Sequence, residues 1–122
     1  MTNILKAASI SLFIATAFSS VANAHAHLSM ATPAADSIVA TAPTELDLKF
    51  SEDVNLKFSG VKVMGPNNAV VAIGAASLTD SDTTLIVPIT DKLAAGTYVV
   101  DWHNLSKDGH KSHGTYKFTV KP

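Results

Sequence analysis

Alternation of apolar and polar residues in short segments constrains the fold of this chain more than any other feature. In 45–50 the apolar side chains alternate with Glu45, Asp47 and Lys49, and a period of two returns in 98–102 and 116–120. Successive side chains of a β-strand point to opposite faces, so this pattern is typical of strands buried on one side. Leu46, Leu48 and Phe50 share one face of their segment. We expect the alternating positions of the other two segments to form the core: Tyr98, Val100, Trp102, Tyr116, Phe118 and Val120.

Turn-forming residues separate these segments from shorter strand candidates. Glycine, proline, asparagine and aspartate gather at 65–68, at 79–82 and at Asp108-Gly109. No segment after residue 24 shows a helical period over three turns. About seven short strands in roughly 100 residues predict one all-β domain, a Greek-key antiparallel sandwich or barrel of Ig-like or cupredoxin-like type. The shorter candidates are 27–32, 59–64, 69–73 and 84–89.

The first 24 residues have the pattern of a cleaved secretory signal. Lys6 is their only charge, an apolar run covers 7–18, and Ala22-Asn23-Ala24 has the small-x-small form of a cleavage site. That run is shorter than the about 20 residues of a membrane span. We therefore expect a mature domain of residues 25–122 that is periplasmic and not inserted in a membrane. A cut after Ala26 also fits the rule and would leave His27 first.

Composition excludes several classes of function. The chain has 9 basic residues, all lysine, against 10 acidic ones. The chain therefore lacks the excess of basic residues that is typical of a nucleic-acid-binding protein. The absence of cysteine excludes disulfides, thiolate metal sites and a cysteine nucleophile. The core alone must stabilise the domain, and we expect Met30 and Met64 to pack in or near it, because methionine fills gaps.

The predicted cut creates a free amino group on His25. Its α-amino nitrogen and its imidazole Nδ1 can close one chelate ring around a metal ion. Two geometries are open for His27. In one, a chain with a free terminus binds Cu(II) or Ni(II) through the His27 imidazole and deprotonated backbone amides. This conflicts with strand pairing from residue 26 or 27, which needs the same amides. Alternatively His27 is a polar strand residue beside the site.

Asp108 and His110 are the second candidate pair. They are two residues apart, so in extended chain both side chains project to the same side, with Gly109 between them. The alternatives are a turn aspartate bonded to its own backbone and an exposed loop histidine. Together with His25 they give nitrogen and oxygen donors suited to tetragonal Cu(II), although Zn(II) accepts many of the same donors. We expect His103 and His113 to be solvated or to lie beside the site.

Short motifs of one known family recur along essentially the whole mature region. They are His25-Ala26-His27-Leu28, Thr32-Pro33-Ala34-Ala35-Asp36-Ser37, Phe50-Ser51-Glu52, Leu93-Ala94-Ala95-Gly96-Thr97-Tyr98, Asp101-Trp102, Asp108-Gly109-His110 and Gly114-Thr115-Tyr116-Lys117-Phe118. Through these motifs the region resembles the CopC family of periplasmic copper-resistance proteins. The resemblance implies a Cu(II) site with His25, Asp108 and His110 as ligands and Glu52 in the outer shell. One departure is the stretch 61–80, where Met64 is the only methionine, so a thioether Cu(I) site is not expected.

The function that follows is a non-enzymatic Cu(II)-binding protein, with one ion per chain, which sequesters copper or passes it to an inner-membrane importer. Two alternatives remain at this point. One is a histidine-brace copper oxidase or monooxygenase, which the Asp108 carboxylate disfavours by occupying space that oxygen chemistry needs. The other is a metal-free interaction module, because a β-sandwich fold does not fix function.

Overall fold

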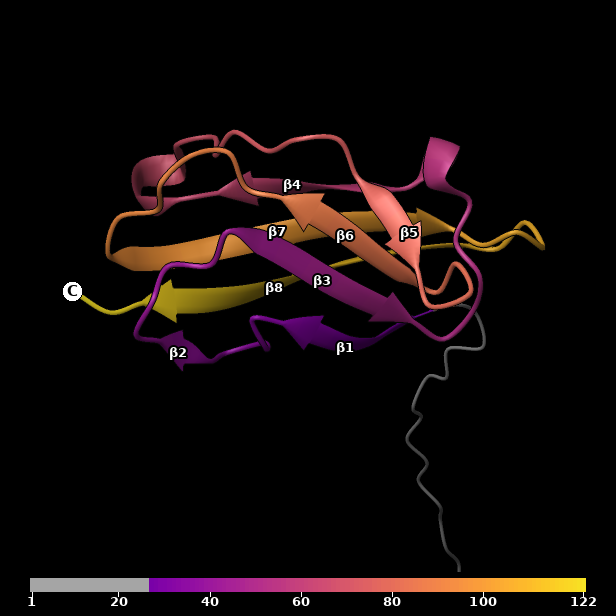
Figure 1. The fold of residues 1–122 in the computed structure, drawn as a ribbon, viewed down its shortest axis with the longest axis horizontal. Coiled ribbons are helices and arrows are strands. Elements are labelled where there is room, and N and C mark those ends of the chain that lie inside the picture. Colours follow the sequence, from indigo (N-terminus) through magenta and orange to yellow (C-terminus); the bar gives the residue numbers. More distant parts are fainter. Residues whose placement is uncertain (1–26) are drawn as a thin grey trace, which may run out of the picture.

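Two four-stranded sheets packed face to face make up residues 27–122, the part of the chain that the computed structural model describes (Figure 1). The predicted signal segment and His25 lie outside the described residues. The first sheet has the strand order β1-β3-β6-β5, with β1 Leu28–Thr32, β3 Glu45–Phe50, β6 Thr84–Pro88 and β5 Ser77–Thr79. The second has the order β2-β8-β7-β4, with β2 Ile38–Val39, β8 Lys111–Val120, β7 Gly96–Leu105 and β4 Gly60–Met64.

The prediction of an all-β sandwich is confirmed. The connections β3–β4, β4–β5 and β6–β7 each cross from one sheet to the other, as in Greek-key folds. All strand pairs are antiparallel except β2 with β8, which is parallel and makes the second sheet mixed. Two single-turn 3-10 helices complete the elements, η1 Leu56–Phe58 and η2 Pro66–Asn68. Within the described residues no helix is long and apolar enough to cross a membrane.

The core lies between the sheets and consists of the alternating positions. All six side chains predicted to form the core are buried, and so are Leu46, Leu48 and Phe50, which share one face of β3. Phe50 of β3 meets Trp102 of β7 edge to face across the two sheets, with ring centroids 5.2 Å apart. Tyr98 and Phe118 stack on neighbouring strands at 5.6 Å. These aromatic contacts join the sheets and hold β7 and β8 in place.

Two local expectations are wrong. Residues 69–73 form no strand; they make only isolated bridges, at Val70 and Ile73. Met30 is 64% exposed instead of packing in the core. The pairing of β1 with β3 shifts register between Leu28 and Met30, so Leu28 and Ala31 face the core and Met30 faces outward. Met64 is half-buried on β4.

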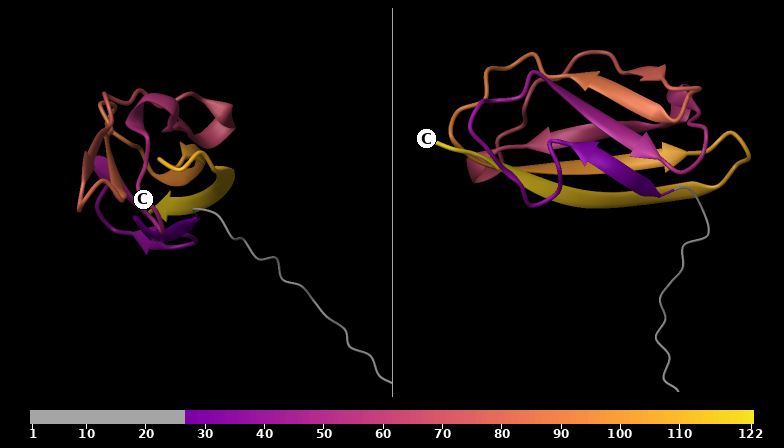
Figure 2. Two further views of the ribbon diagram at one scale, coloured as in Figure 1. Left: turned by 90° about the vertical axis from the view of Figure 1, so that its right-hand side faces the viewer. Right: turned by 60° about the horizontal axis from the view of Figure 1, so that its bottom comes forward.

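The longest pair of strands, β7 and β8, sets the position of the candidate site. They pair from Gly96 with Val120 to Leu105 with Lys111, and a tight loop joins them at one end of the sandwich. β1 begins and β3 ends at that same end (Figures 1 and 2). The fold therefore gathers the start of the described chain, the segment after β3 and the β7–β8 loop.

Candidate metal centre

The loop between β7 and β8 is a tight turn built around Ser106. The Ser106 amide donates to the carbonyl of His110 at 2.9 Å, and the Gly109 amide donates to the carbonyl of Ser106 at 2.9 Å. Gly109 has φ +95°, a conformation that side-chain-bearing residues rarely adopt. The turn therefore requires glycine at position 109, between Asp108 and His110.

Ser106 also orients the two candidate ligands. Its buried hydroxyl donates to Asp108 Oδ1 and accepts from the His110 amide at 3.1 Å. The same amide lies 3.4 Å from Asp108 Oδ1. His110 Nδ1 is 3.1 Å from that carboxylate oxygen. The turn thus holds the carboxylate and the imidazole side by side. It does so through a tight turn and not through the extended chain from which their common side was predicted, and Asp108 also bonds the backbone of its own turn, as the alternative had it.

Glu52 joins this pair from the segment that follows β3. Val54 bridges Ser106, and the Lys107 amide donates to the Asp53 carbonyl at 3.1 Å, which ties the segment to the loop. One ligand atom from each of Glu52, Asp108 and His110 lies within 4.8 Å of the others. Two carboxylates and one imidazole therefore converge at the end of the sandwich.

The charges of the cluster suit a cation. Hydrogen bonds from the Ser106 hydroxyl and the His110 backbone amide, helped by the charge of His110 when protonated, hold the pKa of Asp108 below its ordinary value. Asp108 is therefore a carboxylate at neutral pH. The nearby Lys107 ammonium forms an ion pair with Asp82, which raises the pKa of Lys107. Lys107 is therefore paired with Asp82 and not with Glu52 or Asp108.

His27 begins the described chain beside this cluster. Its amide donates to the Ser51 hydroxyl at 3.0 Å, and its carbonyl accepts from the Ser51 amide at 3.0 Å. Ser51 is the neighbour of Glu52 in sequence. Because the His27 amide already donates in the strand entry, the structure favours the polar strand residue over the amide-wrapped geometry. His25, two residues earlier, lies outside the described residues.

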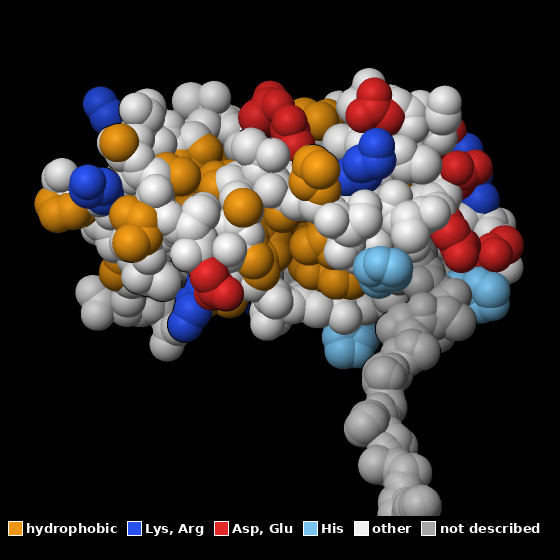
Figure 3. Space-filling view, turned by 90° about the horizontal axis from the view of Figure 1, so that it is seen from below, with side chains coloured by type: hydrophobic (Ala, Val, Ile, Leu, Met, Phe, Trp, Pro, Cys, Tyr) orange, Lys and Arg blue, Asp and Glu red, His pale blue; other side chains and the backbone are white. Residues whose placement is uncertain are grey.

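The wider setting separates the histidines into two groups. Histidine and acidic side chains gather at the end from which the chain enters β1 (Figure 3). His110 belongs to the three-residue cluster. His103 and His113 are exposed, as predicted, and pair with each other across β7 and β8. Neither belongs to that cluster.

Sequence comparison decides the family. The model of the CopC domain matches residues 28–121. The chain belongs to the CopC domain family.

Relatives and solved structures agree with this assignment to the CopC domain. The protein is 48% identical over 99 residues to Protein YobA of Escherichia coli (strain K12), covering 80% of each chain. It is 41% identical over 118 residues to Copper resistance protein C of Escherichia coli, covering 90% of each. The crystal structure of PcoC, a methionine-rich copper resistance protein from Escherichia coli, aligns with TM-score 0.72 and 38% identity over 80% of this chain and 100% of that one. CopC from Methylosinus trichosporium OB3b aligns with TM-score 0.72 and 32% identity over 80% and 95%.

Two features of this CopC-domain site exceed what the sequence suggested. Ser106 was not predicted to take part, although a serine two residues before an Asp-Gly turn has the spacing to bond the turn. Glu52, expected in the outer shell, has a carboxylate oxygen within the same group of ligand atoms as Asp108 and His110. The position of Glu52 depends on the long-range pairing of Val54 with Ser106, for which sequence gives no signal. The hydrogen bonds of Ser106 to Asp108 and His110 are local to the loop.

Proposed function

We propose that this CopC-domain protein is an exported periplasmic protein that binds one Cu(II) ion tightly. The α-amino nitrogen and imidazole of His25 provide one half of the site, and Asp108 and His110 provide the other, with Glu52 beside them. The observation that carries the proposal is the convergence of Glu52, Asp108 and His110 at the end where His27 begins the described chain. The relatives named copper resistance protein C support copper as the metal.

The donor set favours Cu(II) over Cu(I). Imidazole, amine and carboxylate donors suit Cu(II), whereas Cu(I) prefers several sulfur donors. Met30 and Met64, the methionines of the described residues, lie on β1 and β4, which belong to different sheets. Met30 is exposed and Met64 is half-buried, and the proposal assigns them no thioether site. Copper is the cargo of the protein in this proposal rather than a resident cofactor.

An exposed cluster is consistent with exchange of the ion. Asp108 and His110 are exposed and Glu52 is half-buried, so a partner can reach the metal without unfolding the loop. Such a site allows either sequestration of copper or its delivery to an inner-membrane importer. A copper-loaded chain that supplies importer-containing vesicles faster than free Cu(II) at the same activity would favour delivery.

The direct test is a Cu(II) titration of the mature chain beginning at His25, against a competing chelator. We expect a tight first equivalent whose visible and electron paramagnetic resonance spectra change in His110→Ala. The matched variant His27→Ala should leave those spectra unchanged, because His27 is a strand residue in this account. If the reverse pattern appears, the copper is wrapped by backbone amides and the proposed ligand set is wrong.

The identity of the first residue tests the proposed processing. The intact mass of the protein recovered from the periplasm should correspond to a chain that starts at His25. A chain that starts at His27 would move the chelating amine by two residues and would contradict His25 as a ligand.

A further inference from the structure

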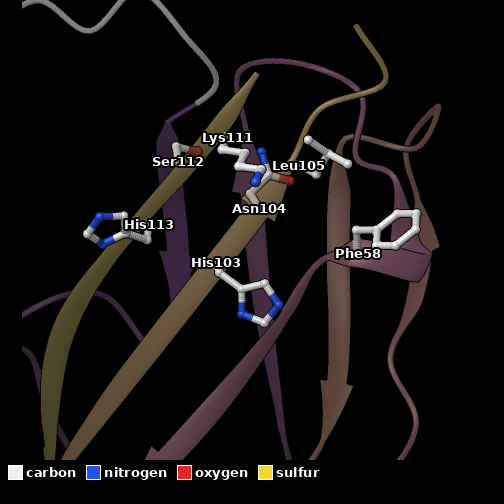
Figure 4. Close-up of a pocket in the computed structure, with 7 residues that line it drawn as sticks. All are labelled: Phe58, His103, Asn104, Leu105, Lys111, Ser112 and His113. Carbon is white, nitrogen blue, oxygen red and sulfur yellow. The ribbon is translucent and has the colours of Figure 1, made fainter. Parts of the chain in front are cut away.

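Two exposed histidines face each other on the outer surface of the second sheet. His103 of β7 and His113 of β8 are direct partners in the antiparallel register. Side chains at directly opposed positions lie on the same face, with Cβ atoms about 4.5–5.5 Å apart. Both side chains are exposed, and Figure 4 shows them on neighbouring strands. This spacing allows two imidazoles to reach one ion.

The surroundings leave room for such an ion. The two histidines border an open hollow of about 350 Å³ that Phe58 of η1 and Lys111 also line. On the other side of His103 its partner in β4 is Gly60, which has no side chain. A Cβ atom there would lie 3.4 Å from the His103 ring. The glycine therefore keeps space for the His103 ring to turn.

A carboxylate lies next to the pair on the same face. Asp101 precedes His103 by two residues in β7, so its side chain projects to the same side, and it is exposed. Lys111 precedes His113 by two residues in β8, so its side chain also projects to this face, but the long side chain can extend into water. The local donor set is thus two imidazoles with one carboxylate in reach.

The rings must turn to share an ion. In Figure 4 the His103 ring leans toward η1 and β4, and the His113 ring leans away from them. Rotation about the Cα–Cβ bonds of two exposed side chains exchanges staggered rotamers without disturbing the core. The strand pairing fixes the Cα positions, and only side-chain torsions have to change.

We propose that His103 and His113 form a second, weaker site for a divalent ion that prefers imidazole, with Asp101 as an additional oxygen donor. Among common divalent ions Cu(II) binds such donors most strongly. The site is separate from the Glu52, Asp108 and His110 cluster, but its two histidines lie on the β7–β8 hairpin whose loop carries Asp108 and His110. A second copper ion, or one leaving the first site, can therefore occupy it. This site does not require the first one to hold copper.

The test uses the untagged mature chain, titrated with Cu(II) in the presence of glycine as a weak competing chelator. We expect a second equivalent that binds at least about tenfold more weakly than the first, a difference of about 1.4 kcal/mol. The double variant His103→Asn/His113→Asn should lose the second equivalent and keep the first. The control Thr97→Asn/Thr119→Asn, at another opposed pair of the same strands, should keep both.

A further variant separates the two proposals. In His110→Ala the tight equivalent should weaken while the His103 and His113 equivalent remains. A second equivalent that survives His103→Asn/His113→Asn, or that never appears in the native chain, contradicts the second site without affecting the first. Circular dichroism of each variant checks that the sandwich is intact.

Discussion

The two ends of the sandwich use the same strands in opposite ways. At the end away from the β7–β8 loop, side chains pack against the backbone or accept its hydrogen bonds. Pro66 lies against Gly96, and the Asp91 carboxylate accepts from the Ala72 amide at 2.8 Å. At the loop end, Glu52, Asp108 and His110 bring two carboxylates and an imidazole together, with much of their surface open to solvent. Folding does not need like charges at close range. The difference is what the proposed metal site requires: the loop end carries groups able to bind a cation, and the other end carries contacts that stabilise the fold.

Removing a charge at each end gives the largest contrast. We expect Asp108→Asn to weaken the tight Cu(II) equivalent about 100-fold, or about 2.7 kcal/mol, because a charged ligand becomes a neutral one. The same substitution at the other end, Asp91→Asn, should leave Cu(II) affinity unchanged. Chelator competition measures both. Equal losses in the two variants would mean that net charge alone governs copper affinity.

A backbone change at the packing end should do the opposite. Gly96 has φ +146°, and an added Cβ would lie 2.5 Å from Pro66 Cγ. Gly96→Ala should therefore lower the free energy of unfolding by about 2 kcal/mol through strain and overpacking. Urea denaturation of the metal-free chain measures this change. Copper affinity should stay the same once the protein is folded, and a parallel loss of affinity would couple the two ends.

Ser106→Ala tests how the loop orients its ligands. The variant removes the hydroxyl that donates to Asp108 and accepts from the His110 amide, so we expect a loss of Cu(II) affinity of about tenfold, or about 1.4 kcal/mol. It should also raise the pKa of Asp108 toward the ordinary value. Ser106→Thr, which keeps the hydroxyl, is the matched comparison. Equal affinities in the alanine variant and the native chain would show that the turn is rigid without Ser106.

The lowered pKa of Asp108 makes the stability of the native chain depend on pH. A carboxyl whose pKa is lowered by folding stabilises the native state above its unfolded pKa, and this contribution disappears as the pH falls through the lower folded value. Asp108 is such a group, although its exposure keeps the effect small. Nuclear magnetic resonance titration of the Asp108 carboxyl should show a higher pKa in Ser106→Ala than in the native chain. An unchanged pKa would remove the hydroxyl as its cause.

Met30→Ser should have the smallest effect of all. The side chain is exposed on β1, so its replacement should change stability by less than about 0.5 kcal/mol. Affinity for Cu(II) should not change either, and the native chain should show no sulfur ligation of Cu(I) by X-ray absorption. A Cu–S signal that disappears in Met30→Ser would add a thioether site to the loop end.

Sequence alone predicted the features that leave a pattern along the chain and missed those that leave none. The period of two identified Tyr98, Val100 and Phe118 as core residues, because a strand with one buried face leaves a local pattern. Asp108 and His110 do lie side by side, but a tight turn brings them together and not the extended chain on which that prediction rested. Ser106 was missed although its bonds to Asp108 and His110 are local, because a single serine beside a turn leaves no periodic pattern. The place of Glu52 in the cluster depends on the pairing of distant segments at Val54 and Ser106. Met30 was placed wrongly, because a register shift in β1 leaves no local signal.

The central claim is that the amino group of His25 is a copper ligand, and one comparison tests it most directly. Cu(II) affinity is measured for the mature chain that begins at His25 and for the same chain with a single glycine added before it. The extension keeps every side chain but moves the free amine away from the His25 imidazole. We predict that the extended chain loses the tight equivalent while its fold, followed by circular dichroism, is unchanged. Equal Cu(II) affinity in the two chains would contradict the account.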